Sequence, residues 1–267
     1  MSLSLAWDPL FRLPLATALV LAAALPLIGA GLRLREQWLS SLGVAQMAAA
    51  GGVAGALLHA PLMLSALLGA ALGGAARAFV GRSRNEHYAV LLLAGWSAVI
   101  LLALQDHHAG NTAMQLLNGQ VYFIALPHLV GAIVLVAALL ASGRWLARRL
   151  LLARLYPDHF QANRQPAWPH ELCFEALVIA GVVLGISTMG VMATFAMMFL
   201  PPWVAFRLAR GWPRALLLSV LIGMLACLAG FLLALSFDLP FGAALVAVLL
   251  LSVPLRLVPF RFGRPGG

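Results

Sequence analysis

Asp106, His107 and His108 form the densest group of metal-ligand side chains in this sequence. Imidazole nitrogens and carboxylate oxygens are donors that Zn²⁺ takes in proteins. Three adjacent residues cannot all point at one ion unless the backbone curls, so the same group also fits a solvated loop. His59 is a further candidate donor, and it fits an interfacial position equally well. These residues predict either a metal-accepting mouth or a polar loop in water.

The sequence lacks the motifs that would make it an enzyme. The segment from His170 to Phe174 begins like a zinc-protease helix, but Phe174 stands where the second histidine is required. The segment from Gly95 to Val99 lacks the closing glycine of a nucleophile elbow. There is no lysine, so the chain cannot form a phosphate-binding loop that needs one. We predict a non-catalytic protein, with any driving ATP hydrolysis carried out by a partner.

The composition decides where these residues must sit. Hydrophobic residues make up 63% of the 267-residue chain and charged residues 9%, against about 25% charged in a soluble domain. Each membrane crossing needs about 20 apolar residues. We predict an all-α, polytopic transmembrane helix bundle of about eight or nine spans, forming one permease domain over residues 1–267. The expected spans are 13–32, 39–58, 62–81, 88–104, 126–143, 172–190, 192–206, 215–236 and 240–258.

The arginines predict the orientation of the bundle. All except Arg12 can be placed on the cytoplasmic side of alternate crossings, which is the positive-inside pattern. This puts the N-terminus outside and the C-terminus inside a bacterial inner membrane. The formal charge of +9 is then explained by topology and anionic lipid headgroups, and not by a nucleic acid partner. The arginines concerned are Arg33, Arg35, Arg77, Arg82, Arg84, Arg144, Arg148, Arg149, Arg154, Arg164, Arg207, Arg210, Arg214, Arg256, Arg261 and Arg264.

The acidic residues restrict the driving force. All lie at or beyond the ends of the apolar runs, with only Glu175 entering a run slightly. Proton-coupled carriers usually hold an ionisable group deep in the bundle. The distribution of the acidic residues therefore favours a passive transport framework that is powered by another protein. The acidic residues are Asp8, Glu36, Glu86, Asp106, Asp158, Glu171, Glu175 and Asp238.

Two long connections and one unusual span complete the layout. Residues 105–125 are expected outside and could include a surface or re-entrant helix, whereas residues 144–171 form a polar loop inside. The second span is rich in Ala and Gly, with Gly51 and Gly55 in a small-xxx-small pattern. Small residues allow close helix packing, and such a helix either packs centrally or lines a pathway.

The last third of the chain carries two ordered motifs. Gly190 is followed by an apolar run to Pro201 and then by a basic end. Asp238, Pro240 and Gly242 form an Asp-x-Pro-x-Gly turn before the final span. These motifs resemble those of the metal-importing ABC transporter permeases of the zinc and manganese type. In that family the segment matching Asp158, His159, Phe160 and Ala162 docks on the ATPase, so the resemblance implies a coupling role for these four residues.

The second span departs from the family pattern. The resemblance places an aspartate and a histidine that line the metal path at positions held here by Gly43 and Met47, with Gln46 adjacent. A thioether is a soft ligand that suits Cu(I) better than Zn²⁺. Gln46 and Met47 could therefore act as neutral ligands in an altered metal pathway. Alternatively, Met47 serves only to pack against neighbouring apolar side chains.

The resemblance implies the membrane subunit of an ABC importer for divalent metal ions, with zinc first and manganese or iron as alternatives. It implies a cytoplasmic ABC ATPase, a periplasmic metal-binding protein and a second copy of the chain as partners. No cofactor is expected on this chain, and the metal ion is the cargo. A self-contained secondary carrier or channel for a metal or small solute is the alternative, and a structural membrane protein without cargo is a third.

Overall fold

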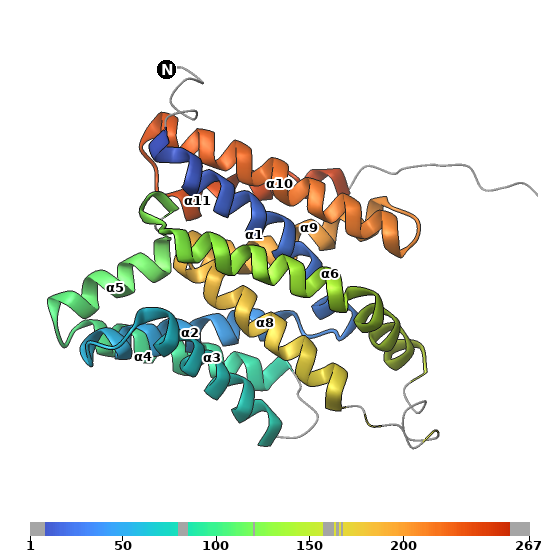
Figure 1. Ribbon diagram of the computed structural model, residues 1–267, viewed down its shortest axis with the longest axis horizontal. Helices are drawn as coiled ribbons and strands as arrows, with labels where there is room; N and C mark the ends of the chain where they lie inside the picture. The colour runs from blue at the N-terminus through green and yellow to red at the C-terminus, as the bar shows by residue number, and fades with distance from the viewer. Residues whose placement is uncertain are drawn as a thin grey trace, which may run out of the picture.

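The computed structural model describes residues 9–79, 85–119, 121–156, 163, 166 and 168–256, and in these residues it contains helices and no strand (Figure 1). This confirms the all-helical bundle. The longer elements are α1 (Pro9–Leu34), α2 (Trp38–Leu57), α3 (Leu62–Phe79), α4 (Asn85–Ala103), α5 (His107–Asn118), α6 (Leu126–Leu155), α8 (Trp168–Met189), α9 (Val191–Leu208), α10 (Trp212–Phe237) and α11 (Phe241–Leu250), with short 3-10 turns η2 (Val121–Phe123) and η3 (Val253–Arg256).

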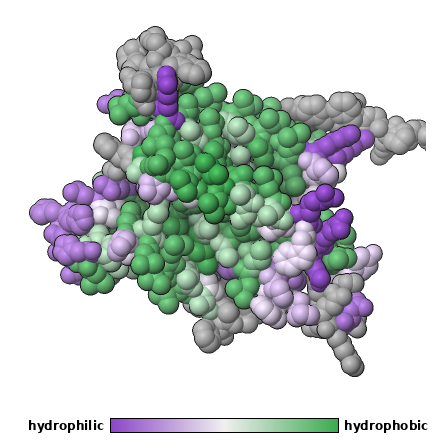
Figure 2. Space-filling view, viewed as in Figure 1, coloured by the Kyte–Doolittle hydropathy of each residue, from purple (hydrophilic) through white to green (hydrophobic). Residues whose placement is uncertain are grey.

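In the described chain, 6 helices are long and apolar enough to cross a membrane, namely α1, α2, α6, α8, α9 and α10. Three stretches form shorter apolar helices: Leu62–Ala75, His87–Ala103 and Phe241–Arg256. Figure 2 shows that the apolar side chains form a broad band over the middle of the molecule. The chain is therefore a multi-pass membrane protein, while the total of eight or nine spans and the side of each terminus stay predictions.

Short connections make successive helices run in opposite directions. Only residues 35–37 separate α1 from α2, only 58–61 separate α2 from α3, and Gly190 alone separates α8 from α9. The bundle therefore has two ends. We call one the histidine end, because His59 and the start of α5 lie there, and the other the arginine end, because α1, α6 and α9 finish there (Figure 1).

Helix α2 lies at the centre of one half of the bundle, between α3 and α4. A Cβ atom on Gly51 would lie 2.8 Å from the Cα of Gly69 and 2.5 Å from the carbonyl oxygen of Ser65. A Cβ on Gly95 of α4 would lie 2.8 Å from the Cβ of Gln46. The small residues of α2 thus let two neighbouring backbones approach closely, as the small-xxx-small pattern predicts.

The observed helices differ from the expected spans at α6 and around α5. We expected a loop from residue 144, but α6 continues as a helix to Leu155, because Leu, Ala and Arg are strong helix formers outside the bilayer as well as inside it. Residues 168–171, also assigned to that loop, belong to α8. The region 105–125 contains α5, a helix of 12 residues whose start is exposed and whose Ala109, Ala113 and Leu116 are buried.

Candidate functional site

His59 and His108 are the two imidazoles that the fold brings together. His59 lies in the turn after α2 with φ of 53°, and His108 lies in the first turn of α5. Their ring centroids are 6.5 Å apart and the ring planes are inclined by 27°. Both side chains are exposed at the histidine end. The packing of α5 against α2 therefore creates a pair of nitrogen ligands that no sequence spacing reveals.

Asp106 and His107 lie beside this pair. Asp106 occupies the N-cap position of α5 in extended conformation, and its side chain makes no capping hydrogen bond. His107 is exposed. Within the described chain, no group of three His, Cys, Asp or Glu side chains is placed to hold a metal ion. The arrangement provides a two-histidine surface, and its role in metal capture stays a prediction.

Gln46 is buried in the α2–α4 interface, whereas the adjacent Met47 is half-buried with its side chain toward α3. Gln46 is 2% exposed, and its Oε1 atom is buried without a hydrogen-bond partner. The Cβ and Cγ atoms of Met47 lie 3.1 Å from the Cβ position that Gly73 of α3 would have. The Met47 side chain thus begins against α3, where packing accounts for it. The side-chain amide oxygen of Gln46, Oε1, is the polar atom of this region whose burial packing does not explain.

Gly43 marks the position at which the resemblance places a carboxylate. A Cβ atom there would lie 3.1 Å from the backbone carbonyl oxygen of Tyr88 and 3.5 Å from the Cβ of Leu91. Tyr88 itself is fully buried. Helix α4 therefore leaves little room for a side chain at position 43.

The two sequence motifs meet at one structural junction. Gly190 has φ of 89°, and a Cβ there would lie 2.6 Å from the amide nitrogen of Gly119. A Cβ on Gly242 would lie 2.5 Å from the carbonyl oxygen of Asn118 and 2.6 Å from that of Met189. Gly190, Gly119 and Gly242 thus allow the end of α5, the α8–α9 corner and the start of α11 to touch backbone to backbone.

The remaining motif residues shape the neighbouring helices. Pro201 and Pro202 are buried inside α9, where a proline removes a helical hydrogen bond. Asp238 ends α10 in the left-handed conformation, with φ of 53° and ψ of 44°. Pro240 is the N-cap residue of α11. Asp238 and Pro240 thus mark the end of α10 and the start of α11, and the roles that the motif match implies for these residues stay predictions.

At the arginine end, two ion pairs connect residues at or near the helix termini. A guanidinium nitrogen of Arg35 lies 3.9 Å from a carboxylate oxygen of Glu171, which connects α1 to α8. Arg154 of α6 donates a hydrogen bond to Glu36. The predicted coupling residues Asp158, His159, Phe160 and Ala162 lie outside the described residues. The two helices that flank them, α6 and α8, both present their ends here.

Sequence reasoning missed a cluster of cations and aromatic rings at this end. The Arg256 guanidinium carbon lies 3.6 Å from the centroid of the Trp203 ring, and that of Arg33 lies 4.9 Å from the Phe206 ring. Such contacts are favourable cation–π interactions. Arginines and aromatic residues near the ends of separate apolar runs are visible in the sequence, but which arginine contacts which ring depends on how the helices pack.

The sequence and the fold both match known transporters. The family model of the ABC 3 transport family matches residues 8–257. The solved structure of PsaBC from Streptococcus pneumoniae in complex with Fab is similar, with a TM-score of 0.80 and 17% identity over 95% of this chain and 92% of that one. A metal-chelate type ABC transporter in an inward-facing conformation gives a TM-score of 0.69 and 20% identity over 97% and 90%. No curated protein sequence matches the chain.

Proposed function

The chain belongs to the ABC 3 transport family, and from this premise we propose that it is the membrane permease subunit of an ATP-driven importer whose cargo is a divalent metal ion. The observation that carries the proposal is the match of the family model over residues 8–257. The similar PsaBC fold, with a TM-score of 0.80, supports it. The predicted family resemblance is thereby confirmed, and the secondary-carrier alternative loses its basis.

Zinc is the cargo that the exposed side chains favour. His59 and His108 stack with ring centroids 6.5 Å apart, and imidazole is a preferred zinc ligand. The Asp106 carboxylate is adjacent and is not used for capping. We place this surface on the outside, where a periplasmic metal-binding protein would deliver the ion. Two ligands hold an ion more weakly than a closed four-ligand site, which suits a surface that must pass its cargo on.

Energy for transport would come from a separate ATPase on the cytoplasmic side. The chain has no lysine for a phosphate-binding loop. Residues Asp158, His159, Phe160 and Ala162 would contact the ATPase between the ends of α6 and α8. We propose that two copies of the chain and two ATPase subunits form the importer in the bacterial inner membrane. ATPase dimerisation would drive transport by binding one permease conformation more tightly than the other.

A panel of metals tests the cargo. The chain is isolated from its own cells together with the ATPase that co-purifies, and the complex is reconstituted into liposomes. Uptake of Zn²⁺, Mn²⁺, Fe²⁺ and Cu⁺ is then compared at equal concentrations. The proposal predicts fastest uptake of Zn²⁺. Preference for Cu⁺ would contradict a divalent cargo, and uptake of no metal would contradict the proposed function.

Histidine variants test the entry surface. His59→Ala and His108→Ala should each raise the zinc concentration needed for half-maximal uptake by about ten-fold, because one ligand of a weak site is lost. His128→Ala is the matched control, since the Nδ1 atom of His128 lies 3.3 Å from the carbonyl oxygen of Ala125 in its own helix turn. Equal kinetics in all three variants would contradict a role for the pair.

A further inference from the structure

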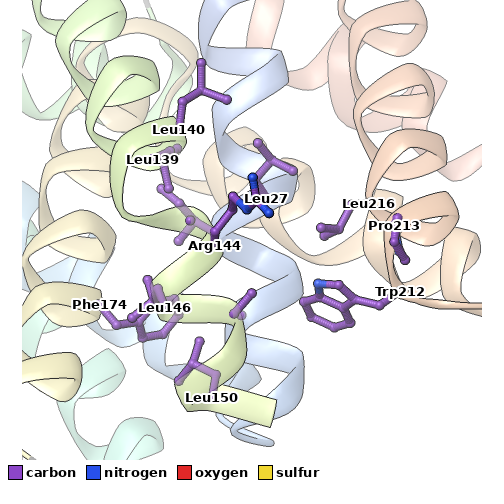
Figure 3. Close-up of a pocket in the computed structure, with 14 residues that line it drawn as sticks. Leu27, Leu139, Leu140, Arg144, Leu146, Leu150, Phe174, Trp212, Pro213 and Leu216 are labelled. Carbon is purple, nitrogen blue, oxygen red and sulfur yellow. The ribbon is translucent and has the colours of Figure 1, made fainter.

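A groove opens between α1, α6 and α10 at the arginine end, with a cavity volume of about 380 Å³ (Figure 3). Its walls are apolar apart from one guanidinium group. Helix α6 supplies one wall, α10 supplies the other, and α1 forms the floor. The size is within the usual range of small-molecule sites. The lining includes Leu27, Leu139, Leu140, Gly143, Arg144 and Trp212.

Arg144 is the charged residue of this lining. Figure 3 shows its side chain directed across the groove toward Leu27 of α1. It makes no hydrogen bond or ion pair with any residue in the described part of the chain. A charged side chain near the hydrocarbon region is costly without a partner, and a free arginine normally extends toward the aqueous interface. The groove therefore presents an uncompensated positive charge to whatever occupies it.

Trp212 of α10 lies on the opposite wall of the groove (Figure 3). Its Nε1 atom is buried and has no hydrogen-bond partner among the described residues. Because this atom is not accessible, its N–H does not reach an occupant of the groove, and the ring contributes apolar surface. Arg144 is therefore the donor that an acceptor in the groove would meet.

The depth of the groove matches one surface of the bilayer. Arg144 is the first charged residue after the apolar start of α6 at Leu126. At about 1.5 Å per residue, the intervening segment is about as long as the hydrocarbon core is thick. Helix α6 faces outward, because only 11% of its most apolar window is buried. The groove therefore opens to lipid at the level where phosphate groups lie.

We propose that this groove binds one anionic phospholipid, whose phosphate accepts hydrogen bonds from Arg144 and whose acyl chain lies along Leu27, Leu139 and Leu140. The occupant must combine a negative acceptor with an apolar chain, because the groove combines a guanidinium donor with apolar walls. The basic charge of the chain and the gathering of arginines at this end attract anionic lipids of the inner leaflet. This site does not depend on which metal is transported.

Gly143 offers a way to block the groove without removing its charge. A Cβ atom at Gly143 would meet nothing within 4 Å, so a larger side chain fits into the groove itself. Leucine also favours a helix more than glycine does. Gly143→Leu should therefore fold at least as well as the wild type while occupying the space of the acyl chain. Gly143→Ala is the matched control that leaves the groove open.

The test uses the full chain purified in mild detergent, with native mass spectrometry after addition of phosphatidylglycerol or phosphatidylethanolamine. The wild type, Gly143→Ala and Arg148→Gln should retain phosphatidylglycerol in preference to phosphatidylethanolamine. Arg148 is one turn further along α6 and outside the groove lining. Arg144→Gln and Gly143→Leu should reduce retention by about ten-fold, as expected for the loss of a charge-assisted hydrogen bond or of the binding space.

A thermal-stability measurement separates loss of binding from loss of folding. Phosphatidylglycerol should raise the melting temperature of the wild type and of the two controls, because a ligand that binds only the folded state stabilises it. It should leave that of Arg144→Gln and Gly143→Leu unchanged. Equal lipid retention by all variants would overturn the proposal. So would dimerisation that is lost in both groove variants while lipid retention persists, because the groove would then bind a second copy.

Discussion

Helices α2 and α6 are both long apolar spans, but α2 is mostly buried within the bundle and α6 is mostly exposed on its surface. In their most apolar windows, 72% of α2 is buried and only 11% of α6. Helix α2 consists largely of Ala and Gly and lies between α3 and α4, whereas α6 exposes large side chains such as Val134 and Leu140. Within this pair, the small side chains of the central helix permit close packing, whereas the exposed helix carries large apolar side chains.

The sharpest test of this comparison is the same substitution in both helices. Gly51→Leu should lower the free energy of unfolding by about 3 kcal/mol or more, because overpacking a filled interface is destabilising and the carbonyl oxygen of Ser65 would lie 2.5 Å from the new Cβ. Gly143→Leu in α6 should not destabilise. The measurement is the fraction of monodisperse protein and its melting temperature in detergent. Equal losses in the two variants would contradict the packing difference.

The glycine junction should give the next largest effect. Gly190 has φ of 89° and ψ of 163°, a backbone conformation that essentially only glycine adopts. Gly190→Ala should therefore cost about 2 kcal/mol from backbone strain alone, and the contact with Gly119 should add to it. Thermal unfolding measures the loss. Gly211→Ala is the control for backbone strain alone, because Gly211 has the same φ of 89° and a Cβ there would meet nothing within 4 Å. An equal loss of stability in both variants would show that the contact between Gly190 and Gly119 contributes nothing.

Gln46→Leu tests the one polar atom that packing in α2 does not explain. Removing a buried acceptor that has no hydrogen-bond partner should leave the stability unchanged or raise it by about 1 kcal/mol. If the Oε1 atom contacts the cargo, zinc uptake should fall while the melting temperature holds. Uptake and thermal unfolding are measured on the same preparation. Unchanged uptake would assign Gln46 to the helix interface and remove it from the pathway.

The smallest effect is expected at the arginine end. Glu36 and Arg154 form a hydrogen-bonded ion pair, but their side chains are 65% and 50% exposed. Exposed pairs of this kind contribute about 0–1 kcal/mol. Glu36→Ala should accordingly shift the melting temperature very little, and high salt should erase the shift by screening. A large, salt-insensitive loss would show that the pair fixes the ends of α1 and α6.

The positions of the helices could be predicted because lipid imposes length and apolarity on each span. Gly51 and Gly55 also predicted close packing correctly, since small residues leave few other roles in a buried helix. The end of α6 could not be predicted from hydropathy, because the arginine-rich stretch after residue 143 keeps its helical preference after it leaves the apolar band. Hydropathy indicates whether a segment lies in lipid or in water, but it does not indicate where a helix ends.

The candidate site was predictable only in its residue types. Asp106, His107 and His108 were identifiable as ligand-type side chains, but the partnership of His108 with His59 depends on how α5 packs against α2. The closure of the Gly43 position by Tyr88 depends likewise on the approach of α4. The groove at Arg144 requires three helices that are distant in the sequence. Contacts between segments that are distant in the chain cannot be predicted from local sequence patterns.

We propose that this chain forms the path while a separate ATPase supplies the energy. Zinc accumulation against its gradient should therefore be measured in liposomes that contain either the chain alone or the chain with its co-purified ATPase, each with and without ATP. Accumulation is expected only when both the ATPase and ATP are present. Accumulation by the chain alone, without ATP, would contradict it.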